Sequence, residues 1–491
     1  MHFIVHKKNI TTMLLWQKHN ILHMICKNKK INLQISKKCT TIETSIVRIP
    51  FEVKILTSTE VAMVPYNKMS VRQLENELAL LNKQYDGYKN QNLKLDMSRG
   101  KPEASQLDCA MGMLDTVNST LGAISESGID CRNYGSPDGL PEVRKMLADM
   151  LEVGMDEIIV GGNSSLNLMY DTVARAITLG VYGSDKPWCK EPVIKFLCPS
   201  PGYDRHFAIC QHFGIKMIPI EMTSEGPDMD QVEEYVNHDP AVKGIWCVPK
   251  YSNPQGITYS KATVERFARL RPAARDFRIF WDNAYTIHGF EEEDEHLENL
   301  FALLKQYGKA DMVFIFGSTS KVSFAGSGLA ALAASRSNIE LTKKQMAIQT
   351  IGYDKISQLM HVRYFKDFAG LKAHMKNHAD LLRPRFHMVD DIFHKNLDGL
   401  EVANWTLPKG GYFISFNTLE SCAKRTVQLC QAAGVTLTPA GATYPYGIDP
   451  HDTNIRVAPS FPSMDELATA AELLCLCTKI SAVEYLLTIS I

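Results

Sequence analysis

The sequence predicts an α/β protein with a largely parallel sheet, followed by a smaller α+β unit. Between about residues 110 and 340, short apolar segments alternate with helical patterns. This alternation is typical of parallel strands joined by crossover helices. Beyond residue 340 the pattern changes to long helical stretches followed by separated strands. Because 491 residues also exceed the usual size of one domain, we expect two or more domains.

Each element is expected from its own pattern of apolar residues. A helix over 70–85 places its apolar side chains on one face. Five strands of the large sheet are expected in the segments EIIVGG, VIKFLCPS, GIWCVP, FRIFWDNA and DMVFIFGS. After residue 340 we expect helices over 339–351 and about 355–396, strands in GGYFISFN and NIRVAP, and a last helix near 464–477.

Composition narrows the class of function. A hydrophobic content of 45% and a charged content of 22% are ordinary for a globular protein. The formal net charge of −1 predicts neither a nucleic-acid nor a membrane partner, and no run of 18 apolar residues is present. The 12 cysteines show no C-x-x-C pair and no Cys/His ligand spacing. Reduced thiols, no metal site and a cytoplasmic location are therefore expected.

Residues 1–68 differ from the rest of the chain. Glu43 is the first acidic residue, and every basic residue before Arg48 other than histidine is a lysine. A mitochondrial transit peptide is poor in acid but rich in arginine, so the match is incomplete. The alternatives are a dispensable extension, an organelle-targeting segment and real structure.

Polar residues follow the predicted strands, at the sheet edge where open α/β proteins bind ligands. GGNSS, with Asn163, Ser164 and Ser165, precedes a helix whose N-terminus would suit a phosphate. The alternative is that Ser164 only caps that helix. Tyr203 follows the next strand, either as a half-buried aromatic or as a face on which a ring stacks.

Three further strand ends carry groups with chemistry. Asn253 lies before Pro254, either as a plain turn or as a rigid amide donor. Asp282 ends an apolar strand, where its carboxylate needs a cationic partner, either an Arg or Lys of the protein or a bound cation. Tyr285 is three residues further on and can reach the same pocket. Lys321 follows three hydroxyl residues, as a solvated loop lysine or as a reactive amine.

Each of these residues has a structural explanation when it is taken alone, but the set does not. An anion site, an aromatic face, an amide, a carboxylate, a phenol and an amine match the needs of pyridoxal 5'-phosphate. Lysine is required because only an amine can form an imine with the cofactor's aldehyde. The sequence therefore predicts a pyridoxal-phosphate site.

The motifs SNPQG, WDNAY, STSK and NIRVAPSFP resemble those of the class I/II aminotransferases, which are fold-type-I pyridoxal-phosphate enzymes. SRGKP, RNYGSPDG, SSLNLMYD, PGYDRHF, GPDMD, STSKVSFAGSG and GGYFISF are similar to the bacterial-type aspartate aminotransferase subgroup. The resemblance covers about residues 69–485. It implies a large domain over 113–339 with a mainly parallel seven-stranded sheet, and a small domain formed by 69–112 and 340–491.

The resemblance also implies roles for individual residues. Lys321 would be the Schiff-base lysine, and Asp282 would pair with the pyridinium nitrogen. Tyr203 would stack on the ring and assist catalysis, while Asn253 and Tyr285 would bond the phenolic oxygen. The phosphate would be held by the backbone at Asn163 and by the side chains of Ser164, Ser165 and Ser318. Tyr134 would reach the phosphate across the interface of a homodimer with shared active sites. Arg456 would bind the substrate α-carboxylate.

The implied reaction moves an amino group from aspartate to 2-oxoglutarate by a ping-pong mechanism. Gly100 in SRGKP would line the substrate site, and either Arg99 or Arg132 would bind the distal carboxylate. One departure is clear: where many relatives carry a phosphate-binding arginine after the lysine, this chain has Gly328 and Leu329.

Two rival classes stay open on sequence alone. The first is another enzyme on the same scaffold: an alanine-, kynurenine- or aromatic-type aminotransferase, or a pyridoxal-phosphate lyase. The second is a non-catalytic ligand sensor that keeps the fold. A sensor of the transcription-regulator kind needs a DNA-binding helix-turn-helix, for which residues 1–68 are too short and irregular.

Overall fold

A computed structural model describes residues 64–490. The predictions made for residues 1–63 lie outside the described residues. Among those described, no helix combines the length and the apolar character needed to cross a bilayer. Residues 66–68 form a short 3-10 helix, and Tyr66 is buried in the core of the C-terminal unit.

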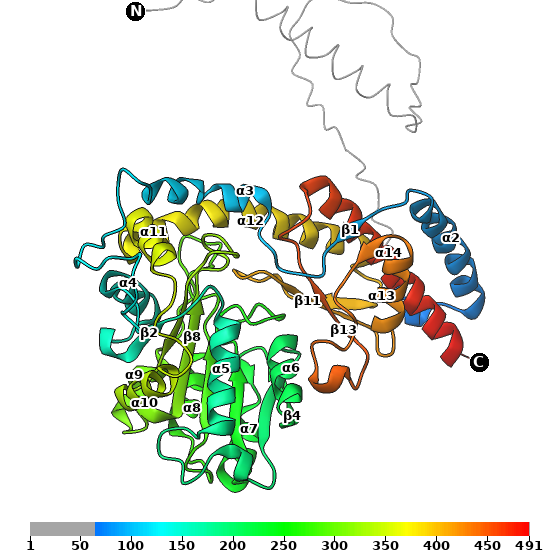
Figure 1. Cartoon of the computed structure of the whole chain (residues 1–491). Coiled ribbons are helices and arrows are strands. Elements are labelled where there is room, and N and C mark those ends of the chain that lie inside the picture. Colours follow the sequence, from blue (N-terminus) through cyan, green and yellow to red (C-terminus); the bar gives the residue numbers. More distant parts are fainter. Residues whose placement is uncertain (1–63, 491) are drawn as a thin grey trace, which may run out of the picture. The chain divides into compact units, whose positions relative to one another are not determined.

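The large sheet has eight strands in the order β2-β9-β8-β7-β6-β3-β4-β5 (Figure 1). Neighbours from β4 to β8 pair in parallel, whereas β9 pairs antiparallel with both β8 and β2. The predicted fold class is confirmed, and the two-residue β5 adds an eighth strand at the edge. The strands are β2 (Ile158–Val160), β3 (Lys195–Ser200), β4 (Lys216–Thr223), β5 (Gly226–Pro227), β6 (Val242–Cys247), β7 (Arg278–Asp282), β8 (Val313–Ser318) and β9 (Ala330–Ala333).

Two apolar cores cover the two faces of this sheet because side chains alternate along each strand. In β7, Phe280 packs in one core, whereas Ile279 and Trp281 pack in the other. Helices α5 (Ser165–Thr178), α6 (Asp204–His212) and α10 (Arg336–Met346) contribute to the first core. The second core is formed with α4 (Pro141–Leu151), α7 (Met229–His238), α8 (Lys261–Arg269), α9 (Leu300–Gln306) and α11 (Lys355–Phe365).

A third core belongs to the smaller unit, which contains the antiparallel sheet β10-β11-β13. Its strands are β10 (Ala403–Trp405), β11 (Ile414–Thr418) and β13 (Asn454–Val457), and the short pair β1 (Leu95–Asp96) and β12 (Val435–Thr436) lies apart. Helices α2 (Val71–Lys89), α13 (Ala423–Ala432) and α14 (Met464–Ile489) pack around them. The segment near residue 70 thus shares a core with the C-terminus.

Helix α12 (Phe368–Leu397) joins the two units (Figure 1). Its first turns place Leu371 and Met375 in a core of the large sheet, and its later turns place Phe386 and Phe393 in the core of the smaller unit. The domain boundaries predicted from the sequence stay predictions, since this helix belongs to both. The short helix α3 (Ala104–Asp108) lies between β1 and α4 in the sequence.

Candidate active site

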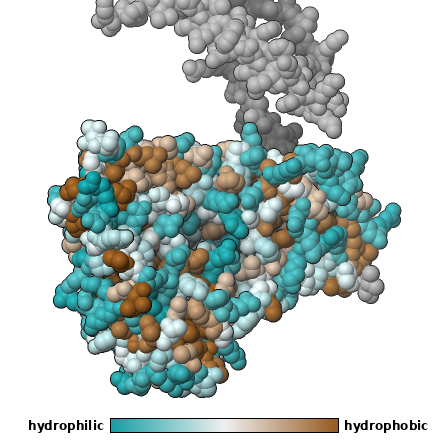
Figure 2. Space-filling view, in the orientation of Figure 1, coloured by the Kyte–Doolittle hydropathy of each residue, from teal (hydrophilic) through white to brown (hydrophobic). Residues whose placement is uncertain are grey.

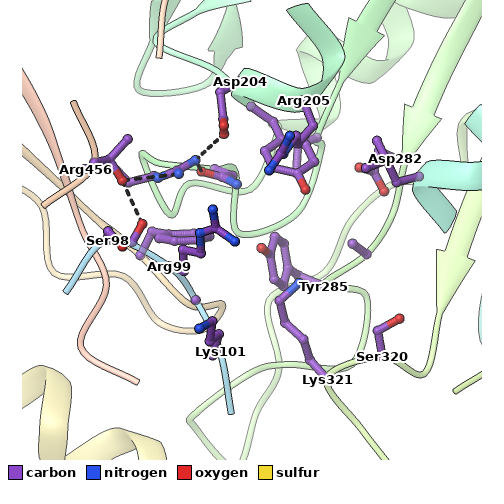
Figure 3. A pocket seen from close by; sticks show the side chains of 18 of the residues that line it. Ser98, Arg99, Lys101, Asp204, Arg205, Asp282, Tyr285, Ser320, Lys321 and Arg456 are labelled. Carbon is purple, nitrogen blue, oxygen red and sulfur yellow. Dashed lines mark hydrogen bonds and ion pairs between the residues drawn. The ribbon is translucent and has the colours of Figure 1, made fainter. Parts of the chain in front are cut away.

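A cavity of about 660 Å³ opens where the carboxyl ends of β7 and β8 meet the smaller unit (Figure 3). Its wall from the large sheet includes Asp282, Tyr285 and Lys321, and its wall from the smaller unit includes Arg456. The cavity brings together most of the residues predicted from strand ends: Ser164, Ser165, Tyr203, Asn253, Asp282, Tyr285, Ser318 and Lys321.

Asp282 is buried at the end of β7, with one carboxylate oxygen paired and the other free. Its Oδ2 lies 3.1 Å from Nε2 of His206, whose ring stacks on Trp246 at a centroid distance of 4.3 Å. Oδ1 is buried without a hydrogen-bond partner among the described residues. A buried unpaired carboxylate oxygen is costly. It suits a bound N–H cation such as a pyridinium.

His206 was not predicted from the sequence. It lies on α6 among apolar residues, where a histidine is ordinarily a core residue. Its spacing of three residues from Tyr203 places it at the helix N-terminus that lines the cavity. That spacing was the only signal available.

Lys321 lies in the turn after β8, with its side chain half-buried in the cavity wall. Its Nζ is 5.0 Å from the ring centroid of Tyr285 and 5.6 Å from that of Tyr412. Burial lowers the pKa of Lys321; the charge of Asp282 opposes this shift, and that of Arg456 adds to it. A lowered pKa increases the fraction of neutral amine, the form that acts as a nucleophile or base.

The backbone around Lys321 is held by groups from other elements. Tyr412 Oη donates to the carbonyl of Lys321 at 3.4 Å, and His374 on α12 donates to the carbonyl of Val322 at 2.8 Å. His361 on α11 accepts from Ser323 at 2.7 Å, while its Nδ1 donates to the Ser357 carbonyl at 2.6 Å. These contacts position the lysine without using its amine.

The hydroxyl groups that were predicted for a phosphate gather at the start of α5. Ser164 is the N-cap residue, but its side chain makes no capping hydrogen bond, so helix capping does not explain it. Ser320, which the prediction missed, donates to the carbonyl of Asn163 at 3.0 Å. The side chain of Asn163 itself donates to Gly326 O and does not line the cavity.

Tyr203, Asn253 and Tyr285 line the same cavity. Burial, followed by the nearby charge of Asp282, raises the pKa of Tyr203 to about 12. Burial also raises the pKa of Tyr285 well above its ordinary value, so its phenol stays protonated and can donate. Asn253 accepts from Arg456 at 3.3 Å through Oδ1, which leaves its amide nitrogen as a donor.

Arg456 on β13 is fixed from several sides. One Nη pairs with Asp204 at 2.8 Å, the other donates to Thr438 at 3.3 Å, and the guanidinium carbon lies 4.8 Å from the ring centroid of Phe413. Its Nε is buried without a hydrogen-bond partner among the described residues. The arginine is held in place and still has donor capacity for a carboxylate.

The two candidate arginines for a distal carboxylate lie in different places. Arg99 and Gly100 line the cavity, and Lys101 lies beside them (Figure 3). Arg132 instead forms a two-point contact with Asp130, at 2.9 and 2.7 Å, outside the cavity of its own chain. Tyr134 is also outside, with 83% of its surface exposed.

Comparison with known proteins identifies the chain. Residues 69–489 match the family model described as aspartate amino-transferase. The chain belongs to this family. An aspartate aminotransferase of Corynebacterium glutamicum is 40% identical over 405 residues, which are 82% of this chain and 93% of that protein. The protein is thus an aminotransferase of the fold-type-I class, as the sequence motifs predicted.

Solved structures agree with this membership. A crystal structure of an aspartate transaminase from Corynebacterium glutamicum superposes with a TM-score of 0.84 at 38% identity, over 86% of this chain and 99% of that chain. An α-aminoadipate aminotransferase from Thermus thermophilus, solved with a phosphopyridoxyl-leucine complex, has a TM-score of 0.64 at 17% identity and covers 81% of this chain and 93% of that chain. At that identity the likeness supports the fold alone.

Proposed function

We propose that this aminotransferase uses pyridoxal 5'-phosphate to move an amino group between aspartate and 2-oxoglutarate. The observation that carries the proposal is the single cavity that contains Lys321, the unpaired Oδ1 of Asp282 and the fixed guanidinium of Arg456. The names of the relatives at 38–40% identity support the choice of aspartate.

The residues of the cavity fit the cofactor. Asp282 Oδ1 would accept from the pyridinium N–H, and Tyr285 and Asn253 would donate to the phenolic oxygen. Ser164, Ser165, Ser318 and Ser320 offer hydroxyls for the phosphate beside the N-terminus of α5. When bound, pyridoxal phosphate supplies an electron sink for a carbanion at the substrate α-carbon.

The side chains of the chain itself then perform the proton transfers. As a neutral amine, Lys321 Nζ takes the α-proton of the substrate as general base and returns a proton as general acid. Arg456 orients the α-carboxylate through its planar fork. Because one lysine and one arginine serve both half-reactions, the donor gives up its amino group and leaves as its 2-oxo acid before the second 2-oxo acid binds and takes up that group. This order gives ping-pong kinetics.

Positive charge in the cavity favours dicarboxylic substrates. Arg99 and Lys101 line it in addition to Arg456. A monocarboxylic substrate, as in the alanine-type alternative, would leave Arg99 and Lys101 in contact with water and not with a carboxylate. We propose Arg99 as a ligand of the distal carboxylate. The contact of Arg132 with Asp130 favours a loop-stabilising role, and its action on substrate stays a prediction.

We further propose a homodimer with shared sites. Tyr134 is a large aromatic side chain with 83% of its surface exposed. Single exposed aromatic side chains are common, but a ring this exposed is free to contact a second copy of the chain. In this proposal the Tyr134 phenol reaches the phosphate in the neighbouring subunit.

A spectral titration tests the proposed substrates. The purified protein, loaded with pyridoxal phosphate, is scanned from 300 to about 500 nm after addition of single amino acids. Aspartate and glutamate are expected to change the spectrum at lower concentrations than alanine, kynurenine or phenylalanine. A response to alanine or an aromatic amino acid at lower concentrations than to aspartate would replace the proposed substrate class.

A further inference from the structure

Tyr412 is a tyrosine of the smaller unit that contacts the turn of Lys321 and has no role in the predicted cofactor site. It lies just before β11 in the segment GGYFISF, and only 1% of its surface is exposed. Its Oη accepts from Nε2 of Gln106 at 3.0 Å and donates to the carbonyl of Lys321 at 3.4 Å. Burial raises the pKa of Tyr412 above its ordinary value, so the phenol stays neutral.

Two glycines allow the smaller unit to approach this turn closely. Gly410 forms an antiparallel bridge with Gly289, and the N–H of Gly411 donates to the carbonyl of His288 at 3.0 Å. A Cβ on Gly410 would lie 2.5 Å from the carbonyl oxygen of His288, and Gly411 has a φ of 84°. Glycine meets both conditions without strain. The Gly-Gly pair thus brings the next residue, Tyr412, against the turn that carries the lysine.

Tyr285 and Tyr412, here called the tyrosine pair, both face the amine of Lys321. Their rings are stacked at a centroid distance of 6.2 Å and an interplanar angle of 25°. Lys321 Nζ lies 5.0 Å from the ring centroid of Tyr285, toward which it extends in Figure 3, and 5.6 Å from that of Tyr412. An ammonium group within about 6 Å of an aromatic centroid is attracted by the negative face of the ring. Two rings from different units therefore favour one position of the charged amine.

The other titratable groups near the amine come from several elements. Burial disfavours the ammonium form of Lys321 most, Asp282 at the end of β7 favours it, and Arg456 on β13 disfavours it. His288 lies 5.6 and 5.9 Å from the two rings, and burial, followed by the charge of Lys321, lowers its pKa well below the ordinary value. Burial also lowers the pKa of the histidines on α11 and α12 beside this turn: His361, His374 and His378. These four histidines are therefore neutral at neutral pH, and the tyrosine pair offsets part of the effect of burial.

We propose that Tyr412 is a positioning residue for Lys321: its ring holds the free amine, and its hydroxyl connects the backbone of the lysine to the smaller unit. This inference rests on the proposed function, in which the amine acts as base and acid at the substrate α-carbon. A lysine side chain is long and flexible, so holding its amine in one position before proton transfer reduces the entropy lost in the transition state. Arg456 lies on β13, the antiparallel neighbour of β11. Tyr412 thus ties the lysine to the same small sheet that carries the carboxylate-binding arginine.

The test removes either the hydroxyl or the ring. Tyr412→Phe keeps the ring, whereas Tyr412→Leu and Tyr412→Met replace it with apolar side chains of two different shapes, so that one can serve if the other fails to fold. Tyr85→Phe and Tyr85→Leu are the matched controls. Tyr85 is buried in the same core, donates to the carbonyl of Leu429 at 2.8 Å and lies outside the cavity.

Two measurements are made on the full chain. In the cofactor-free proteins, acetylation of Lys321 by a trace of acetic anhydride is followed against pH by peptide mass mapping, which gives the pKa of the amine. In the proteins loaded with pyridoxal phosphate, kcat and KM are measured with aspartate and with α-deuterated aspartate. Thermal melting of every variant records any loss of stability.

Loss of the ring is expected to reduce the proton affinity of Lys321 by about threefold to tenfold, and so to lower its pKa, because an aromatic face that favours the ammonium is removed. Tyr412→Phe and both Tyr85 variants should change this affinity less than about twofold, since they keep the tyrosine pair's rings. In the loaded proteins, kcat should fall about tenfold or more on loss of the ring and about threefold in Tyr412→Phe, with little change in KM. The isotope effect should rise as proton transfer becomes slower.

A pKa of Lys321 that is unchanged or raised after loss of the ring would overturn the proposal. Equal falls of kcat in Tyr412→Leu and Tyr85→Leu, at equal losses of melting temperature, would also overturn it, because packing alone would then explain the effect. A wild-type kcat in Tyr412→Phe would refute the role of the hydroxyl. The pKa measurement needs neither cofactor nor substrate, so it decides the role of the ring separately from the proposed function, which fails if the wild type does not turn over aspartate.

Discussion

At the scale of single residues, the proposed chemistry depends on the pair of His206 and Asp282. His206 is hydrogen-bonded to Oδ2 of Asp282, whereas Oδ1 of Asp282 is buried and has no hydrogen-bond partner among the described residues. The stacking of His206 on Trp246 fixes the direction of that hydrogen bond. The free oxygen is therefore preorganised before any cofactor binds, which is the condition under which an electrostatic contact is most effective.

Replacing Asp282 with Asn should separate cofactor binding from turnover. The amide keeps the size of the side chain but cannot stabilise a positively charged pyridine nitrogen. Asp282→Asn is expected to bind pyridoxal phosphate and to lose roughly two or more orders of magnitude in kcat, on the scale of other electrostatic contacts in active sites. Single-turnover kinetics with aspartate measure this loss, with Asp115→Asn on the surface as a control. A rate close to that of the wild type would refute the role assigned to this carboxylate.

At the scale of elements, helices α11 and α12 hold the turn that carries Lys321. His361 on α11 lies 2.7 Å from Ser323 Oγ and 3.1 Å from Thr319 Oγ1, on either side of the lysine in sequence. Its other nitrogen donates to a carbonyl, so the neutral ring satisfies both of its nitrogens. Burial lowers the pKa of His361 to about 4.

This pKa predicts how the stability of the turn depends on pH. In the unfolded chain a histidine has a pKa of about 6.5, so the unfolded state binds a proton first as the pH falls. The stabilisation by neutral His361 is complete above about pH 6.5 and is lost progressively between pH 6.5 and 4. At pH 5 the loss from this residue is about 2 kcal/mol.

Urea unfolding of the wild type and of His361→Gln at pH 7 and pH 5 measures the effect. The variant lacks the titrating group, so its free energy of unfolding should fall less between the two pH values than that of the wild type. Equal falls for the two proteins would show that His361 does not titrate in this way. His378 on α12, whose pKa burial also lowers to about 4, adds a similar term that is common to both proteins.

Elements were predicted from the sequence where their patterns were unambiguous. All five apolar segments proposed for the large sheet form strands β2, β3, β6, β7 and β8, since each is a short buried run that ends at polar or glycine residues. Strand β9 was missed because AALA consists mainly of alanine, the residue with the highest helix propensity. The single helix expected over about 355–396 is broken at Lys366, where φ is 69° and Asp367 begins α12 as an N-cap.

Site residues, like elements, were predictable where they follow a strand with an unambiguous apolar pattern. Lys321, Asp282 and Tyr285 follow strands, so topology alone places them at one sheet edge. His206 and Ser320 were missed because a helical histidine and a loop serine have common structural explanations. Ser320 is distinguished only by the cavity that it lines, and His206 only by its hydrogen bond to Asp282.

At the scale of the whole molecule, the proposed dimer explains residues that the single chain leaves outside its own cavity. Figure 2 shows apolar residues scattered over one face of the described part of the chain. Exposed apolar side chains occur in the segment that precedes Tyr134 in the sequence and in the turn before α11: Met111, Leu114, Leu121, Ile124, Ile348 and Ile351. A second copy is the partner that the shared-site proposal requires for these segments.

Mixing two inactive variants tests the sharing. Lys321→Ala lacks the amine, and Tyr134→Phe lacks the phenol that is proposed to act on the neighbouring site. In a heterodimer one site receives both defects and the other receives neither. After random exchange between equal amounts of the two subunits, half of the dimers are heterodimers, and each carries one intact site. Activity should therefore return to about a quarter of the wild-type value. The test requires Tyr134→Phe to be severely impaired on its own. No recovery in spite of demonstrated subunit exchange would contradict the shared site.

The central claim is that Lys321 binds the cofactor covalently and performs the proton transfer. The most direct measurement is borohydride reduction of the protein loaded with pyridoxal phosphate, followed by peptide mass mapping, for the wild type and for Lys321→Ala. We predict one modified peptide, carrying the cofactor on Lys321, and a folded but inactive Lys321→Ala protein without the adduct. An adduct on a different lysine in the wild type, or turnover of aspartate by Lys321→Ala at a rate near that of the wild type, would contradict the account.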